Sequence, residues 1–353
     1  MPFDDLRLIC PRCRHVGADG TLVRHALACT SSDGPPAVLG RLDDVPALTC
    51  TRPTCAAAYP VIDGIPVIFR QPEAFDLSLS PPADLLSLPP RTLRAAVAGQ
   101  PPGALPALLA RLARHAWAGF HDWLGPEWAF EGLSTGVHPV ELMAWLEGLG
   151  EPAACADGRR LVLGAALGRE AWEVSTGATV LVDGHLSSLQ AARRLIRDGT
   201  LRMVMPIDAT RWGEVTLTAP RAPQVPIALL CCDVLDPPLE ADGFASVIGA
   251  NLVDSVSDPY VALGQSHALT APGGLLTLTS PFAWRGSVTE RNRWLEALSP
   301  HAEASAEDVL LTLAGRKFDP PLTLVARREF VWALRASARE AVVFRSTGWC
   351  LAK

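Results

Sequence analysis

The sequence has no long apolar run. Hydrophobic residues make up 49% of the 353-residue chain, yet no stretch reaches the roughly 18 apolar residues that a membrane-spanning helix needs. The N-terminal segment is acidic and then carries cysteines, which is unlike a secretion signal. We therefore expect a cytoplasmic protein with no membrane partner.

The chain also lacks an excess of positive charge. Its formal net charge is −6, and residues 1–70 carry seven acidic residues against seven arginines. Proteins that bind nucleic acids normally present a strong positive field to the phosphate backbone. The charge balance therefore disfavours a nucleic-acid partner and favours a small-molecule or peptide substrate, and it predicts nothing about oligomeric state.

The glycine turn within residues 161–183, the most informative segment of the chain, lacks the third glycine of a dinucleotide-binding turn. Residues 161–183 read as an apolar strand, a glycine turn, a helix and a second apolar strand that ends in Asp183. Rossmann-type folds build nucleoside sites in this order, since glycines such as Gly164 and Gly168 admit a ligand close to the backbone and the acid accepts ribose hydroxyls. With Ala166 in its middle, the turn is not a dinucleotide fingerprint. S-adenosylmethionine (SAM), which has no pyrophosphate, fits better than NAD.

The nine cysteines are an odd number, and in a reducing compartment they favour metal binding by a subset over a disulfide framework. Four of them form two close pairs, each with the spacing of a metal-binding turn. The alternative is four small buried hydrophobic side chains. Because paired spacing rarely arises by accident, we predict a structural zinc site. Its ligands would be Cys10, Cys13, Cys50 and Cys55.

The residues after the second cysteine pair strengthen this prediction. Residues 59–69, YPVIDGIPVIF, read as a strand, an Asp-Gly turn and a strand. Together with the cysteines, residues 6–70 resemble the small zinc-ribbon family that activates methyltransferases of tRNA and translation factors. The resemblance implies a structural metal. The chain departs from that family in its wider second cysteine pair and in a long insert at about residues 18–45.

Residues 71–155 predict a proline-rich linker and a helical cap. Prolines are frequent between residues 71 and 103, which is typical of a linker with short helical pieces. Residues 104–116 place leucines on one face of a helix, with Arg111, Arg114 and His115 off that face. A further helix is expected at about residues 139–149. Five large aromatic residues between the two helices favour core packing over an aromatic cap on a ligand.

Three more apolar runs follow at the spacing of an α/β fold. They cover residues 227–232, 245–250 and 275–279, and each ends at a polar or turn element. Ligands of a parallel sheet bind at the carboxyl edge, where such elements gather. Asp233 follows the first run. We expect it to accept the adenine amino group, although a helix cap is the alternative.

Residues 156–353 resemble the class I SAM-dependent methyltransferases. The order of the strand-like runs carries the resemblance, together with the Pro-Gly-Gly turn at residues 272–274. Residues 322–335 and 340–344 are compatible with the antiparallel hairpin that closes this fold. We therefore predict an α/β protein: a zinc-ribbon β domain (1–70), the linker and helical cap (71–155), and a Rossmann-like methyltransferase domain (156–353).

Within that class, the chain looks most like the mercaptohistidine N-methyltransferase domain of ovothiol biosynthesis. The turn at residues 164–169, with alanine for the middle glycine and arginine after the last, is similar in that family, as is the Trp-Glu pair at 172–173. The long insert at residues 205–226 has a counterpart there. So does the segment TSPFAW at residues 279–284, with Trp294 downstream.

These positions predict the residues of the site. For SAM we expect Gly164, Ala166, Gly168, Arg169, Asp183, Gly184, Asp233, Val234 and Asn251. The loops beyond the fourth and fifth strands face the methyl acceptor. There we expect Asn251, Asp254 and Trp284 to be catalytic, and Phe282 and Trp284 to contact the substrate. The alternative for each is a structural role in a loop or the core, since residues at strand tips often cap helices.

Val162 departs from the methyltransferase pattern. An acid at this position of the first strand commonly holds the ammonium group of SAM, and losing such a partner costs about 1–3 kcal/mol. In addition, Gly184 and His185 stand where a leucine-serine pair is usual. Three hypotheses follow. The first is a SAM-dependent methyltransferase that acts on a nitrogen or thiol of a histidine-like small molecule or peptide. The second is a catalytically silent scaffold, and the third is an RNA or translation-factor methyltransferase.

Overall fold

The structure is a computed structural model that describes residues 6–16, 22–29, 39, 45, 47–71, 104–133, 135–150 and 158–353. Most of the expected insert at residues 18–45 and nearly all of the proline-rich stretch at 71–103 lie outside these ranges. Among the helices in the described ranges, none has both the length and the apolar character needed to cross a bilayer.

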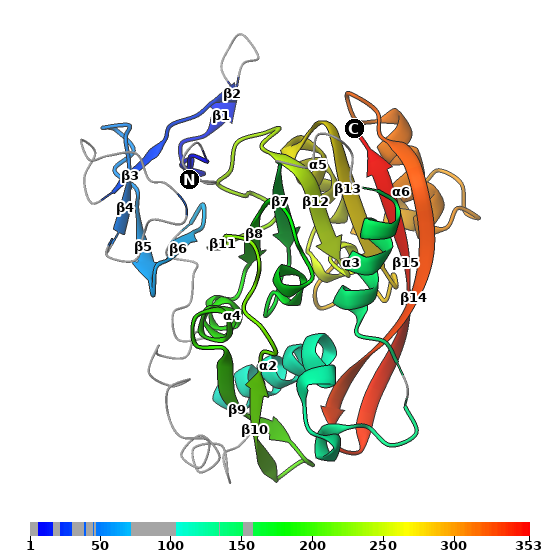
Figure 1. The fold of residues 1–353 in the computed structure, drawn as a ribbon. Coiled ribbons are helices and arrows are strands. Elements are labelled where there is room, and N and C mark those ends of the chain that lie inside the picture. Colours follow the sequence, from blue (N-terminus) through cyan, green and yellow to red (C-terminus); the bar gives the residue numbers. More distant parts are fainter. Residues whose placement is uncertain are drawn as a thin grey trace.

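Five parallel strands form the centre of the main sheet (Figure 1). Both faces of these strands are covered, which explains why they read as nearly continuous apolar runs. Their spatial order is β13-β12-β7-β8-β11, so the order reverses on either side of β7, and ligands of such sheets bind beside that reversal. The strands are β7 (Arg159–Leu163), β8 (Ala178–Asp183), β11 (Ile227–Cys232), β12 (Phe244–Ala250) and β13 (Thr270–Ser280).

A long antiparallel hairpin closes one side of the sheet. It consists of β14 (Thr323–Ser337) and β15 (Glu340–Ala352), and β15 pairs antiparallel with both β13 and β14. The hairpin is the C-terminal element expected of this fold. The fold-class prediction is therefore confirmed: the chain is an α/β protein with a mostly parallel sheet, a C-terminal hairpin and a small N-terminal β region.

Helices cover both faces of the sheet. Because side chains alternate along a strand, Leu161 and Leu163 face one apolar cluster, with α5 (Pro259–Leu269) and α6 (Ala306–Arg316). Val162 faces the opposite cluster. The elements on that side are α2 (Ala104–Phe120), α4 (Leu186–Asp198), and the antiparallel pair β9 (Thr200–Pro206) and β10 (Trp212–Thr218). Beside them, α3 (His138–Gly148) packs on β12 and β14.

The short 3-10 helices lie in the connections. They are η4 (His121–Trp123), η5 (Pro126–Trp128), η7 (Arg169–Trp172), η8 (Val253–Ser255), η9 (Arg291–Arg293) and η10 (Leu295–Leu298). Three of the aromatic residues expected in the core are buried in the apolar cluster on the α2 side of the sheet: Trp117 and Phe120 of α2, and Trp128 of η5. The prediction of core packing is confirmed for these three.

The segment after the glycine turn differs from its prediction. Instead of an α-helix, the chain forms the single 3-10 turn η7, in which every residue is buried. Only eight residues separate Gly168 from Gly177, which leaves no room for several helical turns and a return to the sheet. Gly177 has φ +77°, and a Cβ there would lie 2.5 Å from the carbonyl oxygen of Gly158. Because the connection is this short, it stays close to the sheet, and the charged residues Arg169 and Glu170 of η7 are buried.

The cysteine-bearing region is joined to the main sheet. Its strands β3 (Leu27–Cys29), β4 (Ala47–Cys50), β5 (Ala58–Ile62) and β6 (Ile65–Ile68) pair antiparallel in sequence order. The last of them, β6, pairs parallel with β11 and so continues the central sheet. A separate two-stranded pair, β1 (His15–Val16) and β2 (Leu22–Val23), projects from this region. The antiparallel strands and the parallel sheet are thus connected through main-chain hydrogen bonds.

Candidate functional site

A cavity of about 760 Å³ opens at the carboxyl ends of β7, β8, β11 and β12. Its size is typical of sites for small molecules. The turn after β7, helix α2, the start of α3 and the C-terminal hairpin complete its walls. Ten of the predicted site residues line it: Gly164, Ala166, Gly168, Arg169, Asp183, Gly184, Asp233, Val234, Asn251 and Asp254.

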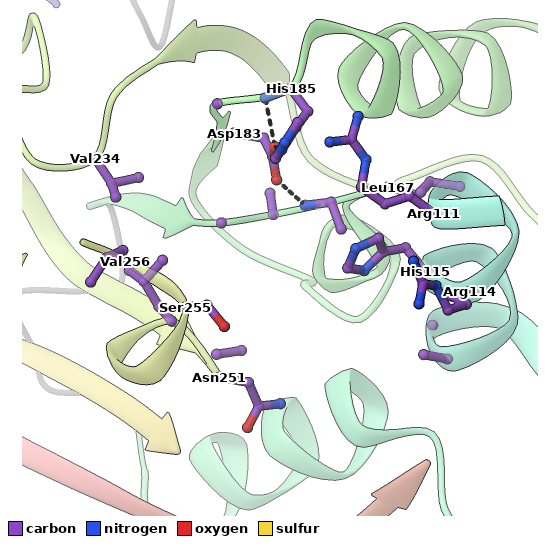
Figure 2. Close-up of a pocket in the computed structure, with 18 of the residues that line it drawn as sticks. Arg111, Arg114, His115, Leu167, Asp183, His185, Val234, Asn251, Ser255 and Val256 are labelled. Atoms are coloured by element: carbon purple, nitrogen blue, oxygen red, sulfur yellow. Dashed lines mark hydrogen bonds and ion pairs between the residues drawn. The ribbon is translucent and has the colours of Figure 1, made fainter. Parts of the chain in front are cut away.

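The glycine turn is built for close approach of the backbone. Gly164 and Gly168 have φ of +71° and +70°, and a Cβ on Gly168 would lie 2.3 Å from a methyl carbon of Leu181. Ala166 also has a positive φ, 50°, which L-residues adopt at a cost. Its N–H donates a hydrogen bond to Asp183 Oδ2 (2.9 Å; Figure 2). That bond stabilises the alanine in a conformation normally left to glycine.

Asp183 is a buried carboxylate that remains ionised. Burial alone would raise its pKa, but hydrogen bonds from His185 and Ala166 bring the pKa below its usual value. The His185 main-chain N–H lies 2.8 Å from Oδ1, and the ring Nδ1 lies 3.1 Å from the same oxygen. Oδ2 accepts only the bond from Ala166 and so keeps a further lone pair, with which it can accept a hydroxyl group of a ligand in the cavity.

Asp233 lies at the tip of β11, as expected. Its side chain is exposed to the cavity, and Oδ1 accepts a hydrogen bond from the Leu235 N–H (2.9 Å). This bond is a local cap of the kind expected as the alternative to a contact between Asp233 and adenine. It also fixes the carboxylate at the mouth of the site, so the two roles are compatible.

Asn251 connects β12 to the C-terminal hairpin. Its Oδ1 accepts hydrogen bonds from Thr279 Oγ1 (3.2 Å) and Ser346 Oγ (2.7 Å). Ser346 in turn accepts a hydrogen bond from Trp332 Nε1 (2.8 Å). His138 Nε2 lies 3.4 Å from the same threonine hydroxyl, and burial lowers the pKa of His138 to about 4. The network therefore holds a neutral imidazole and an amide at the cavity.

Asp254 is buried, and each of its two oxygens accepts one hydrogen bond from the protein. Oδ1 accepts a hydrogen bond from Ser280 Oγ (3.0 Å), and Oδ2 accepts one from the Ala283 N–H (2.9 Å). Burial raises the pKa of this carboxyl group. These two bonds hold the loop after β13 against the cavity, and the catalytic role expected of Asp254 stays a prediction.

The structure places Phe282 and Trp284 away from the cavity that they were expected to line. Phe282 packs on Trp284 and Trp349. Trp284 stacks on Trp294, with 6.0 Å between ring centroids, and donates Nε1–H to Glu296 (3.1 Å). Other residues of this loop line the cavity instead: Pro281, Ala283 and Arg285.

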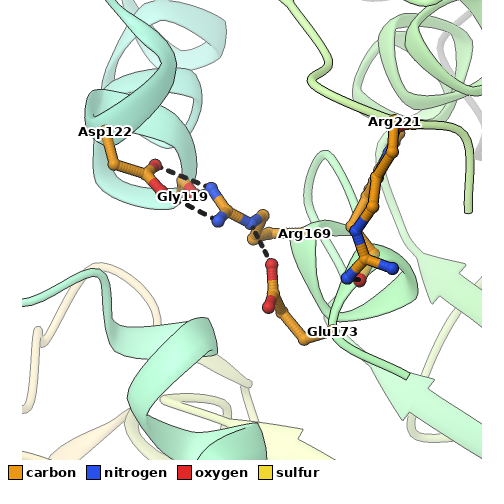
Figure 3. A network of polar contacts seen from close by, with 6 residues as sticks. Gly119, Asp122, Arg169, Glu173 and Arg221 are labelled. Atoms are coloured by element: carbon orange, nitrogen blue, oxygen red, sulfur yellow. Dashed lines mark hydrogen bonds and ion pairs between the residues drawn. The ribbon is translucent and has the colours of Figure 1, made fainter. Parts of the chain in front are cut away.

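Arg169 lines the cavity, but other protein groups occupy its guanidinium (Figure 3). Nη1 and Nη2 donate to the two oxygens of Asp122 (2.7 and 2.9 Å), and Nη1 also donates to the Gly119 carbonyl (3.0 Å). Nε donates to Glu173 (2.8 Å), and the guanidinium carbon lies 4.3 Å from the Trp123 ring centroid. The residue therefore joins the glycine turn to α2 and η4. Its expected contact with the cofactor stays a prediction.

Helix α2 contributes cavity residues that were not among the predicted site residues. Figure 2 shows Arg111, Arg114 and His115 on the side of α2 that faces Asp183. Arg111 donates to Ser187 Oγ (3.2 Å), while its buried Nε has no hydrogen-bond partner. Burial lowers the pKa of His115 to about 4, which leaves it neutral. The helical pattern had placed all three off the apolar face, but only the three-dimensional fold shows what they face.

Glu170 is a fourth cavity residue that was not among the predicted site residues. It lines the cavity although only 4% of its surface is exposed. Its Oε2 is buried with no hydrogen-bond partner. Burial raises the pKa of the carboxyl group to about 7. The sequence carried no signal for this position, because an acid in a helix would normally face solvent.

The four predicted zinc ligands lie together. All four sulfur atoms are within 4.8 Å of one another, with Cys10 Sγ 3.8 Å from Cys55 Sγ and Cys13 Sγ 3.5 Å from Cys50 Sγ. A tetrahedral site with Zn–S bonds of about 2.3 Å needs sulfurs about 3.8 Å apart. The Arg52 main-chain N–H also points at Cys50 Sγ (3.4 Å). The donor set therefore fits a closed structural zinc site.

Comparison with known proteins gives only partial likenesses. No protein-family model matches the chain, and no curated protein matches its sequence. A SAM-dependent methyltransferase from Methanosarcina mazei is 14% identical over 56% of this chain and 93% of its own, with a TM-score of 0.37. Phosphoethanolamine N-methyltransferase 2 from Haemonchus contortus, solved with S-adenosyl-L-methionine, is 16% identical over 48% of this chain and 32% of its own, with a TM-score of 0.32.

Metal analysis tests the cysteine site. We expect one zinc per chain, and replacing Cys50 with serine should remove the metal and lower the thermal unfolding midpoint, since a structural zinc stabilises the fold that holds it. Cys29→Ser is the matched control, because Cys29 lies outside the four-cysteine cluster. A stably folded wild-type protein without metal would contradict the site.

The Arg169 clamp predicts a stability effect. Asp122→Asn keeps the shape of the side chain but removes the charge that accepts two guanidinium hydrogen bonds, so we expect a loss of about 1–3 kcal/mol in the free energy of unfolding. Denaturant titration measures it. Asp198→Asn, which affects an exposed pair with Arg197, should change the free energy little. Equal effects of the two substitutions would show that Asp122 does not hold the clamp together.

Proposed function

We propose that this protein is a SAM-dependent methyltransferase. One observation carries the proposal: a single cavity brings together the Gly164–Gly168 turn, Asp183 and Asp233 at the tips of three neighbouring parallel strands. Along this sheet edge the glycine turn is followed by Asp183, which would accept the ribose hydroxyls, and then by Asp233, which would accept the adenine amino group. A nucleoside bound at such an edge needs its contacts in this order. The glycines of the turn let the backbone approach the ligand closely.

SAM, when bound, supplies a methyl group on a positively charged sulfur, which a nucleophile displaces directly. The protein then has to align the reacting atoms and exclude water. Helix α2 and the hairpin wall the cavity over the glycine turn, with Trp332 and Phe344 as large aromatic walls. Asn251 and neutral His138 are fixed by hydrogen bonds at the same wall, where they can orient an uncharged nitrogen or thiol of the acceptor.

We propose a histidine-like small molecule, or a histidine or amine in a peptide, as the acceptor. Arg111, Arg114 and Arg285 line the cavity, and none of them forms an ion pair with a carboxylate in the described part of the chain. Unpaired guanidinium groups in a cavity favour a ligand with a carboxylate or similar anion. The acceptor that fits both features carries a neutral nucleophile and an acidic group.

A catalytically silent binding protein is the second candidate. Val162 favours it, because its buried side chain provides no charge for the ammonium group of SAM. The resemblance of the cysteine region to activators of tRNA and translation-factor methyltransferases favours a third candidate, a methyltransferase of RNA or of a translation factor. The net charge of −6 disfavours RNA.

Calorimetric titration with SAM and S-adenosylhomocysteine tests cofactor binding. We expect binding by the wild type and a loss of about 10-fold or more in affinity for Asp183→Ala and for Asp233→Ala, since each removes a charged hydrogen-bond acceptor. Asp198→Ala is the matched control on the exposed end of α4. Absence of binding at millimolar ligand would exclude the enzyme, and unchanged affinity in both variants would place the cofactor elsewhere.

Methyl transfer to matched acceptors tests the acceptor class. With labelled SAM, we expect L-histidine or its thiol derivative to be methylated with a kcat/KM at least about 10-fold above that of histamine, which lacks the carboxylate. Arg114→Gln should reduce that ratio. Equal rates for histidine and histamine would contradict the role of the arginines, and methylation of neither would exclude a free histidine-like acceptor.

A further inference from the structure

Val162 leaves the ammonium group of SAM without its usual partner. Its side chain is 1% exposed and packs in the apolar cluster beneath the glycine turn. The same cluster contains Ala171 and Trp172 of η7. The 3-10 turn η7 therefore packs in the same apolar cluster as Val162, the position at which the acid is missing.

Glu170 is the acid that this segment brings to the cavity. It precedes Ala171, is buried, and lines the cavity together with Gly164 and Gly168. Its Oε2 has no hydrogen-bond partner. The adjacent Arg169 does not neutralise it, because that guanidinium donates to Asp122, Glu173 and a main-chain carbonyl.

An unpartnered buried carboxyl group costs stability, so an external partner is needed to explain its position. The partner must be small enough to enter the cavity and must donate hydrogen bonds. A positive charge suits it best, since a cation favours the ionised carboxylate. An ammonium group meets all three conditions.

We propose that Glu170 binds the ammonium group of the methionine part of SAM and replaces the acid that is absent at Val162. The proposal rests on the proposed function, because it presumes that the cavity is the SAM site. It removes the main sequence argument for a silent scaffold, since the missing charge is supplied from the next segment of the chain.

The contact between Glu170 and the ammonium group is tested by measuring the affinity of two ligands for wild type and for one variant. The ligands are S-adenosylhomocysteine and its analogue in which hydrogen replaces the amino group, so the pair differs only in the ammonium. We expect wild type to bind the amino form about 10- to 100-fold more tightly. In Glu170→Gln this ratio should fall close to one, whereas the exposed control Glu147→Gln should keep it.

Each other outcome has a definite meaning. If Glu170→Gln weakens both ligands equally, or leaves the ratio at its wild-type value, the carboxylate does not contact the ammonium and the proposal is wrong. If wild type binds neither ligand, the proposed function itself fails, which is a different result. If wild type binds both forms equally, the cavity does not recognise the ammonium at all.

Stability gives a second readout that also shows whether the variant folds. The empty folded protein holds the Glu170 proton up to a pKa of about 7, against an ordinary value of 4.5. Wild-type stability is therefore reduced progressively as pH rises from about 4.5 to about 7. Glu170→Gln removes this loss, so its thermal midpoint should exceed that of wild type by more at about pH 8 than at about pH 5.

The neighbouring charged and titratable groups are common to both proteins, so the difference isolates Glu170. They are Arg169 and Glu173 on the same segment, Asp122 on η4, His138 and Glu141 on α3, and Arg221 beside Trp172. A variant that is less stable than wild type at high pH would show that Glu170 has a partner within the protein, and would overturn the proposal.

Discussion

The pairing of Arg169 with Asp122 is the contact on which the site depends. The arginine follows the glycine turn directly, and the aspartate lies just beyond the end of α2. Two charge-assisted hydrogen bonds fix both the distance and the plane of the two groups. The helix is therefore held over the turn, and with it the cavity gains a wall that the sheet alone does not provide.

The same clamp explains why charged residues accumulate around an otherwise apolar wall. With Arg169 committed to Asp122 and Glu173, two buried atoms in the described part of the chain, Glu170 Oε2 and Arg111 Nε, have no hydrogen-bond partner. Buried groups of this kind lower stability unless a ligand satisfies them. Such groups commonly mark functional sites, because selection for binding tolerates the cost.

Local sequence patterns predicted much of this architecture. The apolar runs ending in Asp183 and Asp233, the closing hairpin and the two cysteine pairs are all visible over a few residues, and the structure places them as expected. The single 3-10 turn at η7 was missed because strand-turn-helix-strand is the usual pattern, and here the available length decided against the helix. Counting the eight residues between Gly168 and Gly177 would have shown the conflict.

The rest of the site depended on packing that no local pattern records. Phe282 and Trp284 belong to the loop that borders the cavity, as expected. Their side chains do not line the cavity, because Phe282 packs on Trp349 and Trp284 stacks on Trp294. Likewise, what Arg111 and His115 face depends on how α2 packs against β9 and β14 and on the apolar cluster to which it contributes. Side-chain direction at a site is a tertiary property, even where the chain positions are evident from the sequence.

The parallel pairing of β6 with β11 has a consequence for how the molecule behaves in a crowded solution. Without the cysteine-bearing strands, β11 would present an unpaired, apolar edge of the kind that recruits other chains. The small β region therefore acts as a cap against edge-to-edge association.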